Sequence, residues 1–185
     1  MIIVNDFKPG NTFYYENAIY TVLDIQHNKT AMRQMIVKVK AKNLRTGSII
    51  DISFTGGDKV ELAHIEKKKM SYLYDEGTSI CFMDQETFEQ ISVDKERLEW
   101  ELNFLKEGIE VEILDHEGEI MGINLPAKVA LNIVECEPAV RGDTVNKAMK
   151  DAITETGLKV RVPLFVEQGE AIIVYTIDGK YDSRA

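Results

Sequence analysis

The residues best suited to chemistry in this sequence are six cations clustered between residues 28 and 45. That stretch contains no Asp or Glu, although the whole chain carries 31. Ammonium and guanidinium groups bind phosphate, and neutralising even a few phosphates gives strongly salt-dependent binding. A solvated strand face is the alternative, because lysines are common at sheet edges. We favour an anion-binding site made by Lys29, Arg33, Lys38, Lys40, Lys42 and Arg45.

A strand must position these cations, because the run 35–44 alternates with a period of two. In a strand, neighbouring side chains point to opposite faces. Val37, Val39 and Ala41 therefore share one face, and Lys38, Lys40 and Lys42 share the other with Ile36. The β-rich run 19–25 precedes it across a polar tip at 27–34. We expect a hairpin with one basic face.

Groups that could catalyse a reaction or bind a metal are scattered. His27, His64 and His116 lie on separate segments without ligand spacing. We read His27 as a hairpin-tip residue open to solvent or nucleic acid, and the other two as ordinary surface residues. The Gly-rich stretch 55–58 lacks the phosphate-loop pattern and reads as a turn. We expect no catalytic residue, no metal and no cofactor.

The two cysteines, Cys81 and Cys136, lie in apolar runs and cannot form a disulfide framework. We expect both to be buried thiols, which favours a cytoplasmic protein. No apolar run approaches the roughly 20 residues of a membrane span, so we predict no membrane association. The opening residues also lack the pattern of a secretory signal.

Turn signals recur through the chain, and one short helix interrupts the predicted strands. Asp94 is a candidate N-cap, an i, i+4, i+7 apolar pattern follows, and Gly108 ends it. We expect core packing for its apolar residues Leu98, Trp100, Leu102, Phe104 and Leu105.

Charge and weak internal similarity divide the chain into thirds. The stretch 105–111 resembles 157–162, which two related five-stranded barrels would explain. We predict domains at 1–63, 64–126 and 127–185. Their net charges are +2, −10 and −1, so the chain's total of −9 resides mainly in the middle domain.

The most specific pattern lies between residues 150 and 169. Its fixed positions are Lys150, Ala152, Gly157, Val160, Val162, Pro163, Val166 and Gly169. This pattern resembles the signature of the elongation factor P family, and the resemblance spans essentially the whole chain. Shorter matching stretches are Phe7-Lys8-Pro9-Gly10, Phe82-Met83-Asp84, Glu86-Thr87-Phe88-Glu89-Gln90, Gly142-Asp143-Thr144 and Tyr181-x-Ser183-Arg184.

The resemblance implies a mainly β fold of three small β-barrel domains in an elongated, tRNA-like shape. The first would be an SH3-like (KOW-type) domain and the other two OB-fold domains. It implies a monomeric, non-enzymatic translation elongation factor that binds both subunits of the ribosome next to the peptidyl-tRNA. Such a factor promotes peptide bond formation at stalled polyproline sequences by positioning the tRNA acceptor end.

The resemblance also assigns site residues. Gly142, Asp143 and Thr144 would face the exit-site codon of the mRNA and the small subunit. Our charge argument adds RNA phosphate contacts at Lys38, Lys40, Lys42 and Arg45. The hairpin tip, which the resemblance places at the peptidyl-tRNA, comprises Lys29, Thr30, Ala31, Met32, Arg33 and Gln34.

The tip departs from the family pattern at one position that matters. Many members have a tip resembling Lys-Pro-Gly-Lys-Gly-Gln, in which the second Lys is lengthened by modification; others glycosylate an Arg there. Here Met32 occupies that position, and a thioether accepts neither modification. Modification at Arg33 or Lys29, or an unmodified tip, remain the alternatives.

Three other functions remain open at this point. One is a general OB-fold single-stranded RNA-binding protein, which would use stacking and charge. Another is an elongation factor P-like paralogue with the same three-domain plan. The last is a small enzyme of unknown class, against which the scattered histidines argue.

Overall fold

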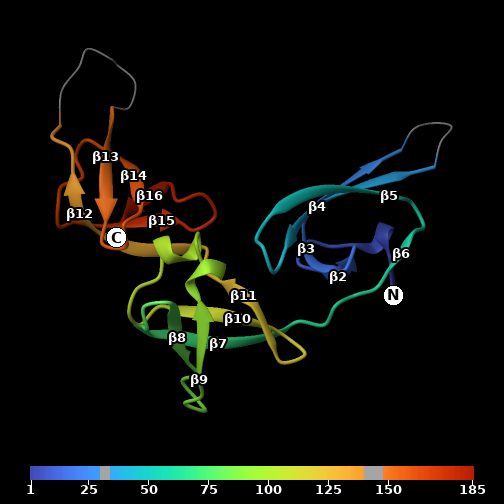
Figure 1. The fold of residues 1–185 in the computed structure, drawn as a ribbon. Coiled ribbons are helices and arrows are strands. Elements are labelled where there is room, and N and C mark those ends of the chain that lie inside the picture. Colours follow the sequence, from blue (N-terminus) through green and yellow to red (C-terminus); the bar gives the residue numbers. More distant parts are fainter. Residues whose placement is uncertain (30–33, 140–147) are drawn as a thin grey trace. The chain divides into compact units, whose positions relative to one another are not determined.

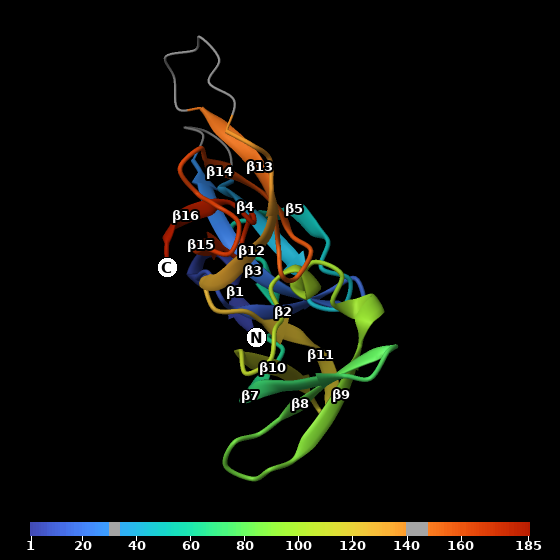
Figure 2. The ribbon, with the colours of Figure 1, turned by 90° about the vertical axis from the view of Figure 1, so that its left-hand side faces the viewer.

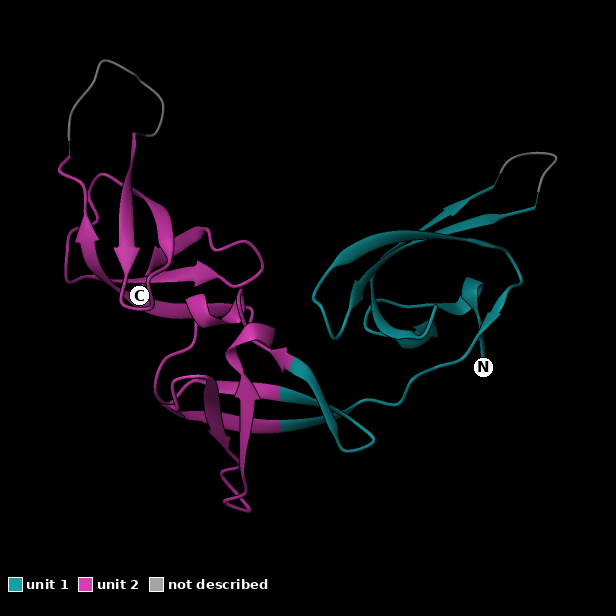
Figure 3. Cartoon of the chain, in the orientation of Figure 1, with its two compact units in different colours: residues 1–68, 113–122 teal, residues 69–112, 123–185 magenta. Residues whose placement is uncertain are grey.

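The computed structural model describes residues 1–29, 34–139 and 148–185 (Figure 1). Within these residues strands dominate, and the helical segments are three short 3-10 turns. None of the helices in the described ranges is long and apolar enough to cross a membrane. The chain separates into two compact units, one of residues 1–68 with 113–122 and one of residues 69–112 with 123–185 (Figure 3).

The first domain is built on an antiparallel sheet in the order β2-β3-β4-β5. Its core holds Phe13 and Phe54, whose rings meet edge to face with centroids 6.1 Å apart. A separate pair, β1 with β6, brings the two ends of the domain together. The elements are β1 (Ile2–Ile3), η1 (Val4–Asp6), β2 (Thr12–Tyr15), β3 (Ala18–Asn28), β4 (Ile36–Asn43), β5 (Ile49–Thr55) and β6 (Lys59–Val60).

The middle sheet has five strands in the order β11-β10-β7-β8-β9. In both views β10 lies between β7 and β11 (Figures 1 and 2). The elements are β7 (Glu66–Asp75), β8 (Ser79–Met83), β9 (Gln90–Asp94), η2 (Lys95–Arg97), η3 (Glu101–Asn103), β10 (Glu110–His116) and β11 (Glu119–Asn124).

The last sheet repeats this plan in the order β14-β13-β12-β15-β16. In both five-stranded sheets the first strand lies at the centre, flanked by the second and the fourth. The outer strands β14 and β16 also contact each other, which closes the barrel. The predicted relation between two five-stranded barrels is therefore confirmed. The strands are β12 (Lys128–Cys136), β13 (Met149–Thr154), β14 (Lys159–Pro163), β15 (Ala171–Tyr175) and β16 (Tyr181–Arg184).

The predicted helix after Asp94 is wrong. The segment forms the two 3-10 turns η2 and η3, and Asp94 makes no side-chain cap. A helix of about ten residues is marginal without packing along one face. Here the buried residues are Leu98, Phe104 and Leu105, whereas Leu102 is only half-buried, so the apolar side chains do not follow a single helical stripe.

Three further expectations about single residues also need correction. Trp100 is 42% exposed rather than a core residue. Cys81 is buried as predicted, but Cys136 is half-buried; both thiols are free. His116 is not an ordinary surface residue, because both of its ring nitrogens make hydrogen bonds.

Candidate nucleic-acid interface

Strand β4 carries the basic face that the sequence predicts. Val37, Val39 and Ala41 are fully buried in the core of the first domain. Lys38 and Lys40, which alternate with them, are exposed, and Lys42 is half-buried. The period of two is confirmed, and three lysines line the outer face of one strand.

Acidic residues from neighbouring strands interrupt this row of lysines. Lys40 pairs with Asp24 of β3 and with Asp51 of β5. A β-bulge shifts the register of β3 between Val22 and Asp24. A bulge inserts one residue and so reverses which side chains face outward beyond it. Val22 is buried, and the bulge turns Asp24 to the exposed face opposite Lys40.

The two other lysines have neutral neighbours. Lys38 pairs with Gln26 and Ser53 across the sheet, close to the hairpin tip. Lys42 pairs with Thr21 and Ile49 at the opposite end of β4. Opposite charges directly across a sheet attract each other, so the two carboxylates weaken the field of Lys40 more than that of Lys38.

Arg45 is already engaged by a carboxylate. Its guanidinium Nη2 lies 2.7 Å from Oε1 of Glu119, and both side chains remain about half-exposed. The turn that carries Arg45 is held by Asn43, whose Oδ1 accepts hydrogen bonds from the N–H groups of Arg45 and Thr46 at 2.9 and 3.0 Å. Arg45 is therefore oriented toward β11 rather than along the lysine row.

The base of the hairpin tip is fixed by Gly56. Its N–H donates to the carbonyl oxygen of Met35 at 2.6 Å. A Cβ at Gly56 would lie 3.0 Å from Cβ of Met35 and 3.1 Å from its oxygen, so a side chain there would require Met35 to give way by a few tenths of an ångström. Lys29 and Gln34, the first and last residues of the tip, are both exposed. Thr30, Ala31, Met32 and Arg33 lie outside the described residues.

Tyr14 connects the first domain's sheet to the hairpin of β10 and β11. Its hydroxyl lies 2.8 Å from Nε2 of His116, whose Nδ1 lies 2.9 Å from the carbonyl oxygen of His64. A carbonyl only accepts, so Nδ1 carries a proton; in the tautomer with that single proton, Nε2 accepts from the Tyr14 hydroxyl. Burial, followed by the nearby Glu117 and Glu61, raises the pKa of Tyr14 above its ordinary value of 10.0.

A small apolar cluster reinforces this contact. Ile19, Ala63, Leu114 and Met121 are buried together. Residues 113–122 thus belong to the same compact unit as the basic face. The hairpin of β10 and β11 thus supplies both Glu119, which contacts Arg45, and His116, which contacts Tyr14.

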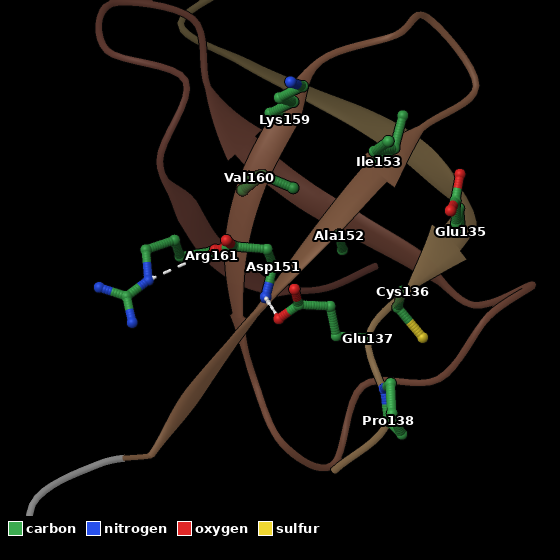
Figure 4. A pocket seen from close by; sticks show the side chains of 10 residues that line it. All are labelled: Glu135, Cys136, Glu137, Pro138, Asp151, Ala152, Ile153, Lys159, Val160 and Arg161. Carbon is green, nitrogen blue, oxygen red and sulfur yellow. Dashed lines mark hydrogen bonds and ion pairs between the residues drawn. The ribbon is translucent and has the colours of Figure 1, made fainter. Parts of the chain in front are cut away.

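One cavity in the described residues lies in the last barrel, beside strands β12, β13 and β14. It has a volume of about 490 Å³, and Figure 4 shows acidic and basic side chains around it. Glu137 Oε2 accepts from the Asp151 N–H at 3.3 Å, and Arg161 Nε lies 3.6 Å from Asp151 Oδ1. The lining residues are Glu135, Cys136, Glu137, Pro138, Asp151, Ala152, Ile153, Lys159, Val160 and Arg161.

This cavity offers no obvious reaction centre. None of its ten described lining residues is a histidine, so the Cys136 thiol has no imidazole base there. Across the described ranges, no group of three or more His, Cys, Asp or Glu residues gathers to hold a metal ion. Gly142, Asp143 and Thr144 lie outside the described residues.

Comparison with known families accounts for the fold of each third. A model described as the elongation factor P KOW-like domain matches residues 3–60. Models for the elongation factor P OB domain and the elongation factor P C-terminal region match residues 65–123 and 129–184. The chain belongs to the elongation factor P family. It is therefore a translation elongation factor, and its fold combines a KOW-like domain with two OB-type barrels.

Full-length relatives support this membership. Elongation factor P from Mycoplasma mycoides subsp. mycoides is 52% identical over 182 residues, which are 98% of this chain and 99% of that protein. The protein of the same name from Mesoplasma florum is 51% identical over 182 residues, 98% of each chain. That from Mycoplasmopsis pulmonis is 49% identical, over all of this chain and 99% of its own length.

A solved structure shares part of the elongation factor P fold. Eukaryotic translation initiation factor 5A from Methanococcus jannaschii aligns with a TM-score of 0.50 at 20% sequence identity. The alignment covers 67% of this chain and 93% of that protein. At this identity, the likeness concerns the fold alone.

Proposed function

We propose that this elongation factor acts without covalent catalysis, by binding the ribosome beside the peptidyl-tRNA and holding the tRNA acceptor end in a reactive geometry. Consecutive prolines react slowly partly because the reacting ends are poorly placed. Orientation supplies up to about 7–11 kcal/mol in favourable cases. About 2 kcal/mol would already give a roughly thirtyfold rate increase, so positioning alone is sufficient.

The observation that carries this proposal is the geometry of β4 and the base of the tip. Lys38 is exposed next to the tip, on a strand whose other face is fully buried. The hydrogen bond between Gly56 and Met35 fixes where the tip begins. A rigid strand with a free ammonium group suits a phosphate backbone, since phosphate contacts fix the register of a bound nucleic acid.

The roles of individual residues follow from this placement. Lys38, Lys40 and Lys42 contact RNA phosphates, with Lys38 the strongest because its cross-strand neighbours are neutral. Arg45 joins them only if it leaves Glu119. The tip residues Met32 and Arg33 reach the terminal nucleotides, because a thioether packs on a base face and a guanidinium stacks or binds phosphate.

The remaining assignments rest on the charge pattern of the sequence and on the family resemblance. We propose domains at 1–63, 64–126 and 127–185, with the acidic middle domain facing away from RNA. Gly142, Asp143 and Thr144 would approach the exit-site codon and the small subunit. The factor would act in the cytoplasm as a monomer and without a cofactor.

Translation of a polyproline reporter tests the proposal. Combined Met32→Ala and Arg33→Ala substitutions should slow synthesis through consecutive prolines and leave a proline-free reporter unchanged. A matched Gln168→Ala variant, at an exposed position of the last barrel, should behave as the parent in both reactions. If the double variant restores proline-rich synthesis as well as the parent does, the tip has no such role.

Co-sedimentation with ribosomes separates this function from general RNA binding. The unsubstituted chain should sediment with stalled ribosomes and bind free single-stranded oligonucleotides weakly. Tight binding to free oligonucleotides would instead favour the OB-fold RNA-binding alternative. The intact mass of the native protein would also show directly whether Lys29 or Arg33 carries an adduct.

A further inference from the structure

The loop between β8 and β9 presents an exposed aromatic side chain. It spans residues 84–89 and extends beyond the ends of the two strands at the bottom of Figure 1. Phe88 in this loop is 69% exposed. A single exposed apolar residue needs no explanation by itself, but the backbone of this one is unusual.

Phe88 adopts a left-handed backbone conformation, with φ at +59°. For a bulky residue this conformation is strained, whereas glycine adopts it freely. Residues held in such conformations persist when the surrounding structure over-determines them, and they concentrate at ligand and switch sites. A glycine at position 88 would give the same loop at lower conformational cost.

Hydrogen bonds hold the rest of the loop in one shape. Oδ1 of Asp84 accepts from the N–H groups of Glu86 and Thr87 at 2.8 and 3.1 Å. The Phe88 N–H donates a hydrogen bond to the carbonyl oxygen of Asp84 at 2.9 Å. The Asp84 N–H donates to the carbonyl oxygen of Glu89, also at 2.9 Å. The phenyl ring is therefore presented to solvent by a preorganised loop, which lowers the entropy lost on binding.

The charge around Phe88 selects the class of partner. Residues 79–94 contain four carboxylates and no Lys or Arg. On the adjacent strand β7, Lys68 lies 3.6 Å from Asp115, and Lys69 lines a cavity together with Glu110 and Glu112. An RNA backbone would be repelled here. The four carboxylates belong to Asp84, Glu86, Glu89 and Asp94.

We propose that Phe88 is an anchor that inserts into an apolar pocket on a protein surface rich in lysine and arginine. Aromatic side chains dominate the energetics of protein interfaces, and complementary charges around them guide association. The inference rests on the proposed function, because it takes the ribosome as the source of that basic protein. It assigns the acidic middle domain a contact with protein, while the basic face of β4 contacts RNA.

Photo-crosslinking on purified ribosomes tests this assignment. p-Benzoylphenylalanine placed at position 88 of the full chain should crosslink to a ribosomal protein. The same group at position 177 is the matched control, because Ile177 is 86% exposed on a different loop; it should not give that product. A crosslink from position 88 to ribosomal RNA alone, or no crosslink while the chain stays bound, overturns the proposal.

Affinity measurements on ribosomes provide the second test. Phe88→Ala should weaken binding at least fivefold, Phe88→Trp should retain it, and Ile177→Ala should leave it unchanged. Phe88→Gly should weaken binding equally while the melting temperature stays the same or rises, because the strain is relieved. If Phe88→Ala binds ribosomes as tightly as the parent, Phe88 is not an anchor, but the proposed function stands. If the unsubstituted chain does not bind ribosomes, the proposed function is refuted as well.

Discussion

Lys40 lies directly opposite Asp51 in the pairing of β4 with β5, and Asp24 flanks it on the other side. The row of lysines on β4 is therefore not a uniform basic surface. Lys38, two residues nearer the tip, lies directly opposite Gln26 and Ser53. Because the two aspartates lie opposite Lys40, the positive charge on this face is least offset at Lys38, toward the tip.

This arrangement predicts unequal effects of two identical substitutions. Lys38→Ala should weaken ribosome binding and reduce the slope of log affinity against log salt by about 0.7–0.9, the value for one lost phosphate contact. Lys40→Ala should have a smaller effect, because Asp24 and Asp51 already offset its charge. Asp51→Asn should strengthen binding. Sedimentation at several salt concentrations measures all three, and a larger loss for Lys40→Ala than for Lys38→Ala would contradict this account.

Gly56 should be as important to activity as any residue that contacts RNA. In Gly56→Ala the new Cβ would approach Cβ of Met35 to 3.0 Å, so Met35, next to the tip, must give way by a few tenths of an ångström. We expect slower polyproline synthesis with a loss of stability of about 1 kcal/mol. Gly122→Ala is the matched control, because its Cβ would meet only the Leu44 oxygen at 3.4 Å. Equal activity of the two variants in the reporter assay would show that Gly56 is not needed to position the tip.

The burial of Tyr14, with Glu117 and Glu61 nearby, predicts a pH dependence of stability at the alkaline end. The pKa of Tyr14 is raised in the folded protein, so its stabilising effect is complete below the unfolded value near 10.0 and is lost as pH rises through the folded pKa. Tyr14→Phe should lower the melting temperature by a few degrees at pH 7. The difference from the parent should shrink as the pH is raised above 10, as measured by circular dichroism. A constant difference across this range would show that the phenol's ionisation is not linked to folding.

Local patterns in the sequence predict the strands of the basic face well. The period of two in 35–44 depends only on the pleat of a strand, and burial of Val37, Val39 and Ala41 follows from it. The neighbours of Lys40 could not be predicted in this way. They depend on strand pairing and on a bulge after Val22 that reverses the outward face of β3.

The family signature is largely structural rather than functional. Ala152, Val160, Val162 and Val166 are buried in the core of the last barrel, and both signature glycines have positive φ. Such positions are readily recognised in a sequence, because packing and backbone geometry restrict them strongly. Phe88 stands in a motif of the same family, yet its exposure and strained backbone could be seen only in the structure.

Phe104 shows why the segment after β9 could not be interpreted from its apolar spacing. It follows the η3 turn, yet its fully buried ring packs in the core of the last barrel with residues such as Leu131 and Val174. It also meets Trp100 edge to face, with centroids 5.3 Å apart, and the Trp100 indole donates to the Thr176 oxygen at 2.9 Å. The segment is thus organised by a barrel whose first strand begins more than twenty residues later.

Removing this ring should therefore destabilise the last barrel. Phe104→Ala should cost about 3–5 kcal/mol, the usual range for a fully buried phenylalanine. Leu102→Ala, a half-buried neighbour, should cost clearly less. Trp100 is the only tryptophan of the chain, so its fluorescence during urea unfolding reports on this contact directly. If both variants unfold at the same urea concentration, Phe104 does not stabilise the last barrel, and the segment from Lys95 to Leu105 contributes only to the middle sheet.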